Sequence, residues 1–160
     1  MTTTTEELEI IEEKYKNAAG DDFVRKWQKG RVLGKGGFAT CYEFKNMDNG
    51  VKWACKLVEK KSLTQNKAKA KLMSEIKIHR CLKHKNIVQF HNFFDDENRI
   101  YIMLEICEND SLHEMLTKRK TLEELEVQYF ARALVTMLVF LRSKRIIHRD
   151  LKLGNILLSN

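Results

Sequence analysis

A cluster of glycines between two predicted strands restricts the folds open to this chain more than any other feature. Residues 34–39 read Gly-Lys-Gly-Gly-Phe-Ala, and residues 40–45 continue as an extended segment. Asn49-Gly50 then predicts a hairpin with a type I′ turn, because both central residues of that turn need positive φ.

A dinucleotide-binding fold requires a helix directly after its glycines, and a P-loop requires Gly-Lys-Ser/Thr. Neither pattern is present. The glycines therefore favour a hairpin loop whose N–H groups can face phosphate oxygens, with a ligand-free glycine-rich hairpin as the alternative.

The rest of the pattern places strands ahead of most helices, which indicates an α+β fold. We predict strands at 31–33, 40–45, 51–58, 87–94 and 99–106, and helices at 65–82, from Ser111 onward and at 121–142. Ser111-x-x-Glu114 and Thr121-x-x-Glu124 are capping-box signatures. In the last helix Phe130, Leu134, Leu138 and Leu141 share one face. Residues 1–22 form a polar extension, where Leu8, Ile11 and Tyr15 leave a short amphipathic helix and a disordered tail equally open.

A lysine and a glutamate have the spacing of a phosphate-binding pair. Lys56 lies on the return strand of the hairpin, and Glu75 lies 19 residues further on, on the inner face of the next predicted helix. A lysine that holds phosphates needs a carboxylate to fix its position. A lysine in a strand is commonplace by itself, so only the combination with the glycine loop favours phosphoryl transfer.

The run from His148 to Asn155 is the most specific motif. It matches His-Arg-Asp-x-Lys-x-x-Asn at five fixed positions, and a polar loop would reach that match by chance only rarely. Asp150 is expected to receive and orient an attacking hydroxyl, since an ordinary aspartate pKa of about 3.9 makes it a weak base before the transition state. Lys152 is expected to neutralise charge on the transferred phosphoryl group, and Asn155 to hold Mg²⁺.

Composition, charge and the cysteine pattern argue against secreted, disulfide-rich and membrane proteins. The net charge is +7, and residues 1–20 contribute −3 of it, so the remainder carries +10. A nucleic-acid-binding domain is a third hypothesis, although no aromatic side chains interleave with the basic cluster of Lys60, Lys61, Lys67, Lys69 and Lys71. The cysteines lack zinc-site spacing, the N-terminus lacks a secretory signal, and no apolar stretch approaches the roughly 18 residues of a membrane helix. We expect neither a disulfide framework nor membrane insertion.

The glycine loop, Lys56, Glu75 and the run 148–155 together resemble the protein kinase domain, over residues 28–160. The closer resemblance is to the polo-like serine/threonine kinases. Their glycine loop is similar to residues 34–39 followed by Cys41, and their catalytic loop is similar to one with Leu153-Gly154. The resemblance implies a protein-kinase-like fold. Residues 23–107 would form a complete N-lobe with a five-stranded antiparallel sheet and one helix, and residues 108–160 the first part of a helical C-lobe.

The resemblance also implies ATP and Mg²⁺ as cofactors and a role for each site residue. Lys56 is expected to contact the α- and β-phosphates and to pair with Glu75, with Asp150 and Lys152 as further catalytic residues and Asn155 as the metal ligand. Leu104 would be the gatekeeper, and Glu105 and Cys107 would offer hinge backbone groups. The other expected nucleotide contacts are Leu33, Gly34, Lys35, Gly36, Gly37, Phe38, Ala39, Cys41, Ala54 and Leu157.

The sequence stops at Asn160, ahead of the Asp-Phe-Gly segment, the activation loop and the polo boxes that the resemblance implies. We therefore expect an incomplete kinase domain with little activity by itself. A non-catalytic module that binds a nucleotide or a protein partner is the alternative. By resemblance alone we further expect a monomer that acts on protein Ser/Thr in the cell cycle, with no nucleic-acid partner. The same resemblance implies a location in the cytoplasm, the nucleus and the centrosome or spindle pole.

Overall fold

The chain divides into two compact units in the computed structural model, which describes residues 9–37, 39–63 and 66–159. The first unit comprises Met1–Cys81 and Phe90–Ile106, and the second comprises Leu82–Gln89 and Cys107–Asn160. In the described part of the chain, no helix combines the length and the apolar character needed to cross a membrane.

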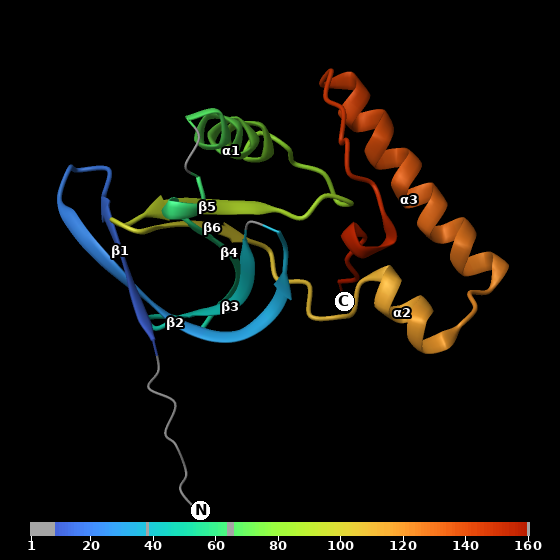
Figure 1. Ribbon diagram of the computed structural model, residues 1–160, viewed down its shortest axis with the longest axis horizontal. Helices are drawn as coiled ribbons and strands as arrows, with labels where there is room; N and C mark the ends of the chain where they lie inside the picture. Colours follow the sequence, from blue (N-terminus) through green and yellow to red (C-terminus); the bar gives the residue numbers. More distant parts are fainter. Residues whose placement is uncertain (1–8, 38, 64–65, 160) are drawn as a thin grey trace, which may run out of the picture. The chain divides into compact units, whose positions relative to one another are not determined.

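The first unit is built on a six-stranded antiparallel sheet with the order β1-β2-β3-β4-β6-β5 (Figure 1). Helix α1, Asn66–His79, follows the short 3-10 helix η1, Lys60–Ser62. The strands are β1 (Ile10–Lys16), β2 (Asp22–Lys35), β3 (Thr40–Asn46), β4 (Lys52–Glu59), β5 (Phe90–Asp95) and β6 (Arg99–Leu104). The predicted α+β class and the protein-kinase-like N-lobe are thus confirmed.

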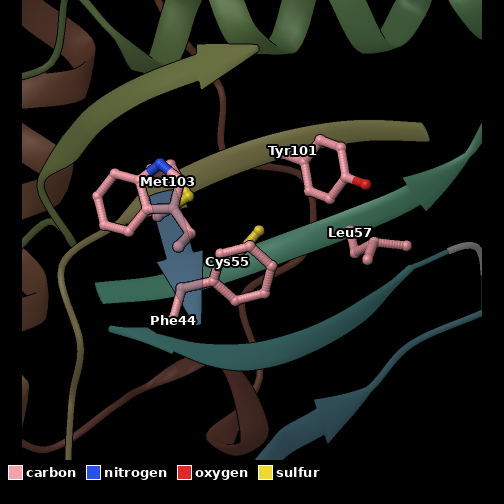
Figure 2. Close-up of a cluster of buried hydrophobic side chains, with 6 residues drawn as sticks. Phe44, Cys55, Leu57, Tyr101 and Met103 are labelled. Carbon is pink, nitrogen blue, oxygen red and sulfur yellow. The ribbon is translucent and has the colours of Figure 1, made fainter. Parts of the chain in front are cut away.

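The two faces of the sheet bury two separate clusters, because side chains along a strand point alternately to opposite faces. One cluster, drawn in Figure 2, consists of the buried residues Trp27, Phe44, Cys55, Leu57, Tyr101 and Met103. The second cluster joins the opposite face to α1 and contains Val58, Leu72, Ile76, Ile100 and Ile102. Cys55 and Leu57 point into the first cluster, and side chains alternate between the two faces along a strand. The Lys56 side chain, which lies between them in the sequence, therefore points to the opposite face, the one that α1 packs against.

Strand β1 was not foreseen, and it makes the expected five-stranded sheet a sheet of six. Residues 10–16 form neither a helix nor a disordered tail but pair with β2 from Ile10↔Gln28 to Lys16↔Asp22. The reason lies in the period-two pattern of this segment, in which Ile11 and Glu13 turn inward. The hairpin closes at Asn17 and Asp21 with Gly20 at φ +92°, a conformation that favours glycine. Leu8, part of the predicted helix, lies outside the described residues.

The hairpin predicted at Asn49-Gly50 is confirmed, but its turn type is wrong. Strands β3 and β4 pair up to Lys45↔Lys52, so the connection is longer than two residues. Only Gly50 of the pair has positive φ, at +73°. The side-chain oxygen of Asn46 accepts hydrogen bonds from the backbone N–H groups of Asp48 and Asn49 and closes the loop locally. This side-chain turn replaces the type I′ geometry.

The second unit contains helix α2 (Leu112–Arg119), helix α3 (Glu124–Ser143) and the short 3-10 helix η2 (Leu153–Asn155). The capping box of Ser111 and Glu114 is confirmed at the start of α2. The one expected at Thr121 and Glu124 is wrong, because Glu123 and Glu126 form the box of α3 instead. The core of this unit is Leu82, Met137 and Leu141, with Leu134 beside them. Leu138, expected on the same face, is 40% exposed.

Candidate functional site

The glycine loop lies between the paired ends of β2 and β3. Gly34 is paired with Cys41 and Lys35 with Thr40, and the N–H of Gly36 donates to the carbonyl oxygen of Ala39 at 2.8 Å. A Cβ added at Gly34 or Gly37 would meet no atom within 4 Å. The fold itself therefore leaves room for side chains at both positions, and the absence of side chains suits a ligand that approaches the backbone closely. Phe38 lies outside the described residues.

The sheet register brings four of the predicted nucleotide contacts onto one face. Cys41 is the partner of Lys56 across β3 and β4, and Ala54 is the partner of Leu104 across β4 and β6. All four side chains are half-buried, as are Leu33, Glu105 and Cys107. Burial raises the pKa of the Cys41 thiol, and the positive charge of Lys56 partly offsets that effect. Cys41 is therefore a neutral thiol close to the ammonium group of Lys56.

The expected ion pair between Lys56 and Glu75 is not formed in the structure. Within residues 9–37, 39–63 and 66–159 no ion pair or hydrogen bond joins the two side chains, and Glu75 is exposed rather than on the inner face. The reason is the helix geometry, since Leu72 and Ile76 occupy the buried positions and each residue turns the helix by about 100°. Glu75 therefore flanks the buried stripe. Its pairing with Lys56 stays a prediction that requires α1 to turn or shift.

In the second unit the structure brings together three of the predicted catalytic and metal-binding residues. The side-chain amide of Asn155 donates to Oδ2 of Asp150 and to the Asp150 carbonyl oxygen, each at 2.8 Å. The ammonium of Lys152 lies 3.2 Å from the same Oδ2. Helix η2, Leu153–Asn155, turns the chain back so that Asn155 can reach Asp150. The motif spacing thus corresponds to one local cluster.

The cluster keeps Asp150 ionised. The hydrogen bond from Asn155, and after it that from Lys152, hold the pKa of the Asp150 carboxyl below its ordinary value. Asp150 follows Arg149, which has φ +67°, and the Asp150 N–H faces Nδ1 of His148 at 3.3 Å. A left-handed conformation at a non-glycine residue is uncommon and clusters at functional sites. The strained Arg149 and the His148 contact together turn the Asp150 backbone toward Asn155.

Leu157, the predicted floor of the nucleotide pocket, is attached to the start of α2. An isolated antiparallel bridge pairs Leu157 with Ser111, and the N–H of Leu112 donates to the carbonyl oxygen of Ile156 at 2.8 Å. Leu157 remains 47% exposed, which leaves its side chain free to contact a ligand. This bridge also explains why the apolar residues 156–158 have a fixed place in the second unit.

Sequence reasoning missed a carboxylate cluster along β1. Glu13 is only 2% exposed, and it accepts hydrogen bonds from Arg25 Nη1, Trp27 Nε1 and Asn92 Nδ2 at 3.0, 2.8 and 2.6 Å. Glu9 binds Lys29 at 2.6 Å and Arg99 at 2.7 Å. The signal was present in the alternation of Glu9, Ile11 and Glu13, which a helical interpretation of the same segment obscures.

Comparison with known proteins identifies the family. The protein kinase domain family matches residues 27–160. The chain is 50% identical over 159 residues to the probable serine/threonine-protein kinase CCRP1 of Zea mays, which covers 99% of this chain and 25% of that protein. It is 47% identical over 132 residues to the cell cycle serine/threonine-protein kinase CDC5/MSD2 of Saccharomyces cerevisiae, covering 82% and 19%. It is 43% identical over 136 residues to the serine/threonine-protein kinase polo of Drosophila melanogaster, covering 85% and 24%.

The chain therefore belongs to the protein kinase family, and the polo-like serine/threonine kinases are among its relatives. The predicted resemblance is confirmed at both levels. The chain spans about a fifth to a quarter of the length of these relatives, as the stated coverages of 25%, 19% and 24% show. The two units are thus parts of one kinase domain, and each carries some of the predicted site residues.

Proposed function

We propose that the protein transfers the γ-phosphoryl group of ATP to Ser or Thr hydroxyls of other proteins. The observation that carries this proposal is the cluster of Asp150, Lys152 and Asn155, with both Lys152 and Asn155 bound to one carboxylate oxygen. Since Oδ2 is engaged in this way, Oδ1 of Asp150 is the atom that can accept a hydrogen bond from an incoming hydroxyl. Lys152 lies two residues after Asp150, which resembles serine/threonine rather than tyrosine kinases.

Each residue of the cluster has a defined part in the reaction. Asp150 orients the hydroxyl and takes its proton late, because its lowered pKa makes it a weak base in the ground state. Lys152 places an ammonium beside the path of the phosphoryl group and offsets the charge that develops there. Positioning and electrostatic stabilisation supply most of the catalysis in phosphoryl transfer. The cluster offers both without a covalent intermediate.

The first unit supplies groups suited to the nucleotide. The backbone N–H groups of the glycine loop and the ammonium of Lys56 suit phosphate oxygens. Ala54 and Leu104, paired across β4 and β6, present apolar surface suited to adenine. Cys41 extends this surface, since burial keeps its thiol protonated and therefore uncharged.

The residues present also fit Mg²⁺. Asn155 uses its Nδ2 for both bonds to Asp150, and no hydrogen bond to its Oδ1 occurs in the described residues. An amide oxygen free of hydrogen bonds is a ligand that Mg²⁺ accepts, and this ion is usually held by few protein oxygens together with phosphates and waters. Asn155 Oδ1 would hold the metal, which would supply charge neutralisation on the phosphates of ATP.

The relatives guide the finer proposals on substrates and setting. CDC5/MSD2 of yeast is named a cell cycle kinase. We extend this to a cell-cycle role for the present protein, with protein substrates, and with the cytoplasm, the nucleus and the centrosome or spindle pole as its locations. These proposals rest on relatedness, whereas the reaction rests on the chemistry of the residues above.

The experiment is a phosphotransfer assay with γ-labelled ATP and a mixture of unphosphorylated proteins, using the full-length protein. We expect label on Ser and Thr that is lost in Lys56→Met and retained in Lys52→Met. Lys52 is a matched control, because it lies on the same strand and its exposed ammonium is paired with Glu43, away from the predicted site residues. A full-length protein that binds ATP but transfers no label would favour the non-catalytic alternative and contradict the proposal.

A further inference from the structure

The sheet of the first unit curls until its first strand contacts its last two. In the strand order, β1 and β5 are at opposite ends. Nevertheless Asn92 of β5 donates to Glu13 of β1 at 2.6 Å, and Arg99 of β6 donates to Glu9, next to β1, at 2.7 Å. Side-chain hydrogen bonds, and not backbone pairing, therefore join the two ends of the sheet. In both of these contacts the acceptor is a carboxylate of the N-terminal segment, Glu13 or Glu9.

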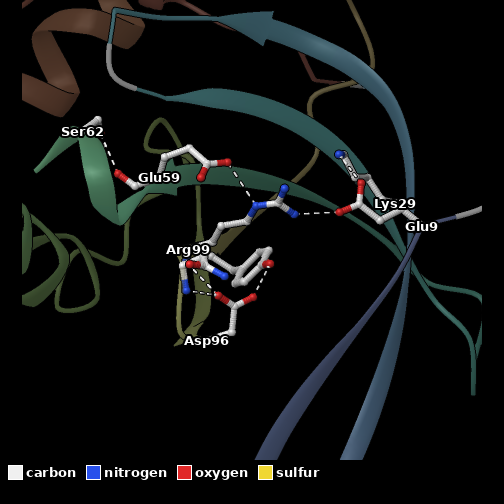
Figure 3. Close-up of polar contacts among 8 residues, drawn as sticks. Glu9, Lys29, Glu59, Ser62, Asp96 and Arg99 are labelled. Atoms are coloured by element: carbon white, nitrogen blue, oxygen red, sulfur yellow. Dashed lines mark hydrogen bonds and ion pairs between the residues drawn. The ribbon is translucent and has the colours of Figure 1, made fainter.

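Arg99 connects this closure to the strand that carries Lys56. Its guanidinium binds Glu9 through Nη1 and Glu59 through Nε, the latter at 3.1 Å, as Figure 3 shows. Glu59 is the last residue of β4 and the register partner of Arg99. Two charge-assisted bonds from one planar group fix its orientation more strictly than a single bond does. Glu9 is itself held from β2 by Lys29 at 2.6 Å.

The same end of the β4–β6 pair is the platform on which α1 rests. Val58 and Ile100 form the next register pair after Glu59 and Arg99, and both are buried against Leu72 and Ile76 of α1. The segment after β4 is tied down as well, since the N–H of Lys60 donates to the carbonyl oxygen of Asn98 at 2.7 Å. The platform and the start of η1 are therefore fixed by residues within one position of Arg99.

We propose that Glu9 is a positioning residue of the kinase site, which acts through Arg99 and Glu59 on the platform that holds α1 and so on the approach of Glu75 to Lys56. This inference rests on the proposed function and adds a control point outside the catalytic motifs. In the described part of the structure Lys56 and Glu75 do not contact each other by an ion pair or a hydrogen bond, so a shift of α1 could bring them together. Because the pair of Glu9 and Arg99 is partly exposed, its direct contribution to the stability of the fold is small.

The test compares Glu9→Gln with Glu12→Gln in the full-length protein. Both changes replace one carboxylate by an amide, at positions three residues apart in the same segment. Glu12 pairs with Lys26 across the β1–β2 hairpin, at 3.8 Å and with both side chains about half exposed. Hydrogen–deuterium exchange is measured by mass spectrometry on peptides that cover residues 66–79. Phosphotransfer rates are measured in parallel at varied ATP and protein substrate.

We expect Glu9→Gln to speed exchange in α1 by about threefold to tenfold, as for a local opening that becomes more frequent, with Glu12→Gln unchanged. The maximal phosphotransfer rate should fall several-fold, while the KM for the protein substrate stays constant. Raising NaCl from about 0.05 M to about 0.5 M should speed α1 exchange more in the wild type than in Glu9→Gln, because salt screens the Glu9–Arg99 ion pair that the variant lacks.

Two results would overturn the inference. One is equal α1 exchange in the Glu9→Gln and Glu12→Gln proteins. The other is faster exchange spread evenly over all strands of the first unit, which would mean that Glu9 only stabilises the fold. Failure of the proposed function would give a different result. Phosphotransfer would then be absent from the wild-type protein as well as from both variants.

Discussion

Asn155 Nδ2 lies 2.8 Å from Oδ2 of Asp150 and donates to it, and the same nitrogen donates to the Asp150 carbonyl oxygen. The two are five positions apart in the chain, and η2 brings them together. With the nitrogen committed twice to Asp150, the amide has only one sensible orientation and its oxygen faces away. One side chain thus holds the proposed base and presents the proposed metal ligand.

Replacing Asn155 should change the titration of Asp150. Because the Asn155 hydrogen bond is the largest influence that lowers the pKa of Asp150, Asn155→Ala should raise that pKa toward the ordinary value of about 3.9. The carboxylate would then become protonated at a higher pH than in the wild type. Carbon-13 NMR of the Asp150 carboxyl carbon during acid titration measures this directly. An unchanged titration midpoint in Asn155→Ala would show that the hydrogen bond does not form in solution.

Removing the buried carboxylate of Glu13 should destabilise the first unit strongly. Glu13→Ala leaves Arg25, Trp27 and Asn92 without their acceptor in a nearly inaccessible place, and losing one partner of a buried pair costs about 3 kcal/mol. Urea unfolding followed by tryptophan fluorescence reports the loss. Glu12→Ala is the control, since that exposed residue should change the free energy of unfolding by less than about 0.5 kcal/mol. Similar losses in the two variants would contradict the assigned role of Glu13.

Two glycines should respond in opposite ways to alanine. Gly34→Ala adds a Cβ that meets no atom within 4 Å, so the free energy of unfolding should stay constant while ATP binding weakens. Gly50→Ala forces a side chain into φ +73°, which should cost about 1 kcal/mol of stability without altering ATP binding. Calorimetric titration with ATP and thermal unfolding measure the two effects. Normal ATP affinity in Gly34→Ala would remove the glycine loop from the nucleotide site.

The cysteines should be alkylated in an order set by their burial. Iodoacetamide reacts with the thiolate, and burial raises the pKa of Cys55 strongly and that of Cys41 as well. Cys81 is exposed, so it should be modified first and Cys55 last. Bound ATP should slow the modification of Cys41 and leave Cys81 unchanged. Peptide mass spectrometry follows all three sites, and ATP protection of Cys81 instead would place the nucleotide elsewhere.

The sequence predicted those parts of the molecule that depend on local spacing. The strands from β3 to β6, the capping box of Ser111 and the loop that joins Asp150 to Asn155 all follow from patterns within a few residues. Part of what it missed depends on partners distant along the chain, because the buried Glu13 accepts a hydrogen bond from Asn92, which is 79 residues away. Strand β1 pairs locally with β2 and was missed because the prediction of a helix or a disordered tail overlooked its period-two pattern. The exposed position of Glu75 likewise depends on which side chains of α1 fit the sheet, and helical periodicity alone could not rank Glu75 against Leu72 and Ile76.

The most direct test of the central claim is the rate of γ-phosphoryl transfer by full-length Asp150→Asn, measured at the same ATP occupancy as in the wild type. Asparagine keeps the size of the side chain but cannot accept the proton of the substrate hydroxyl. We predict a rate at least about 100-fold lower, in the range that general base catalysis contributes, with unchanged affinity for ATP. Asp110→Asn, which removes a carboxylate that is paired with the exposed Lys118, should keep the wild-type rate. Transfer by Asp150→Asn at the wild-type rate would contradict the assignment of Asp150, and with it this account of the site.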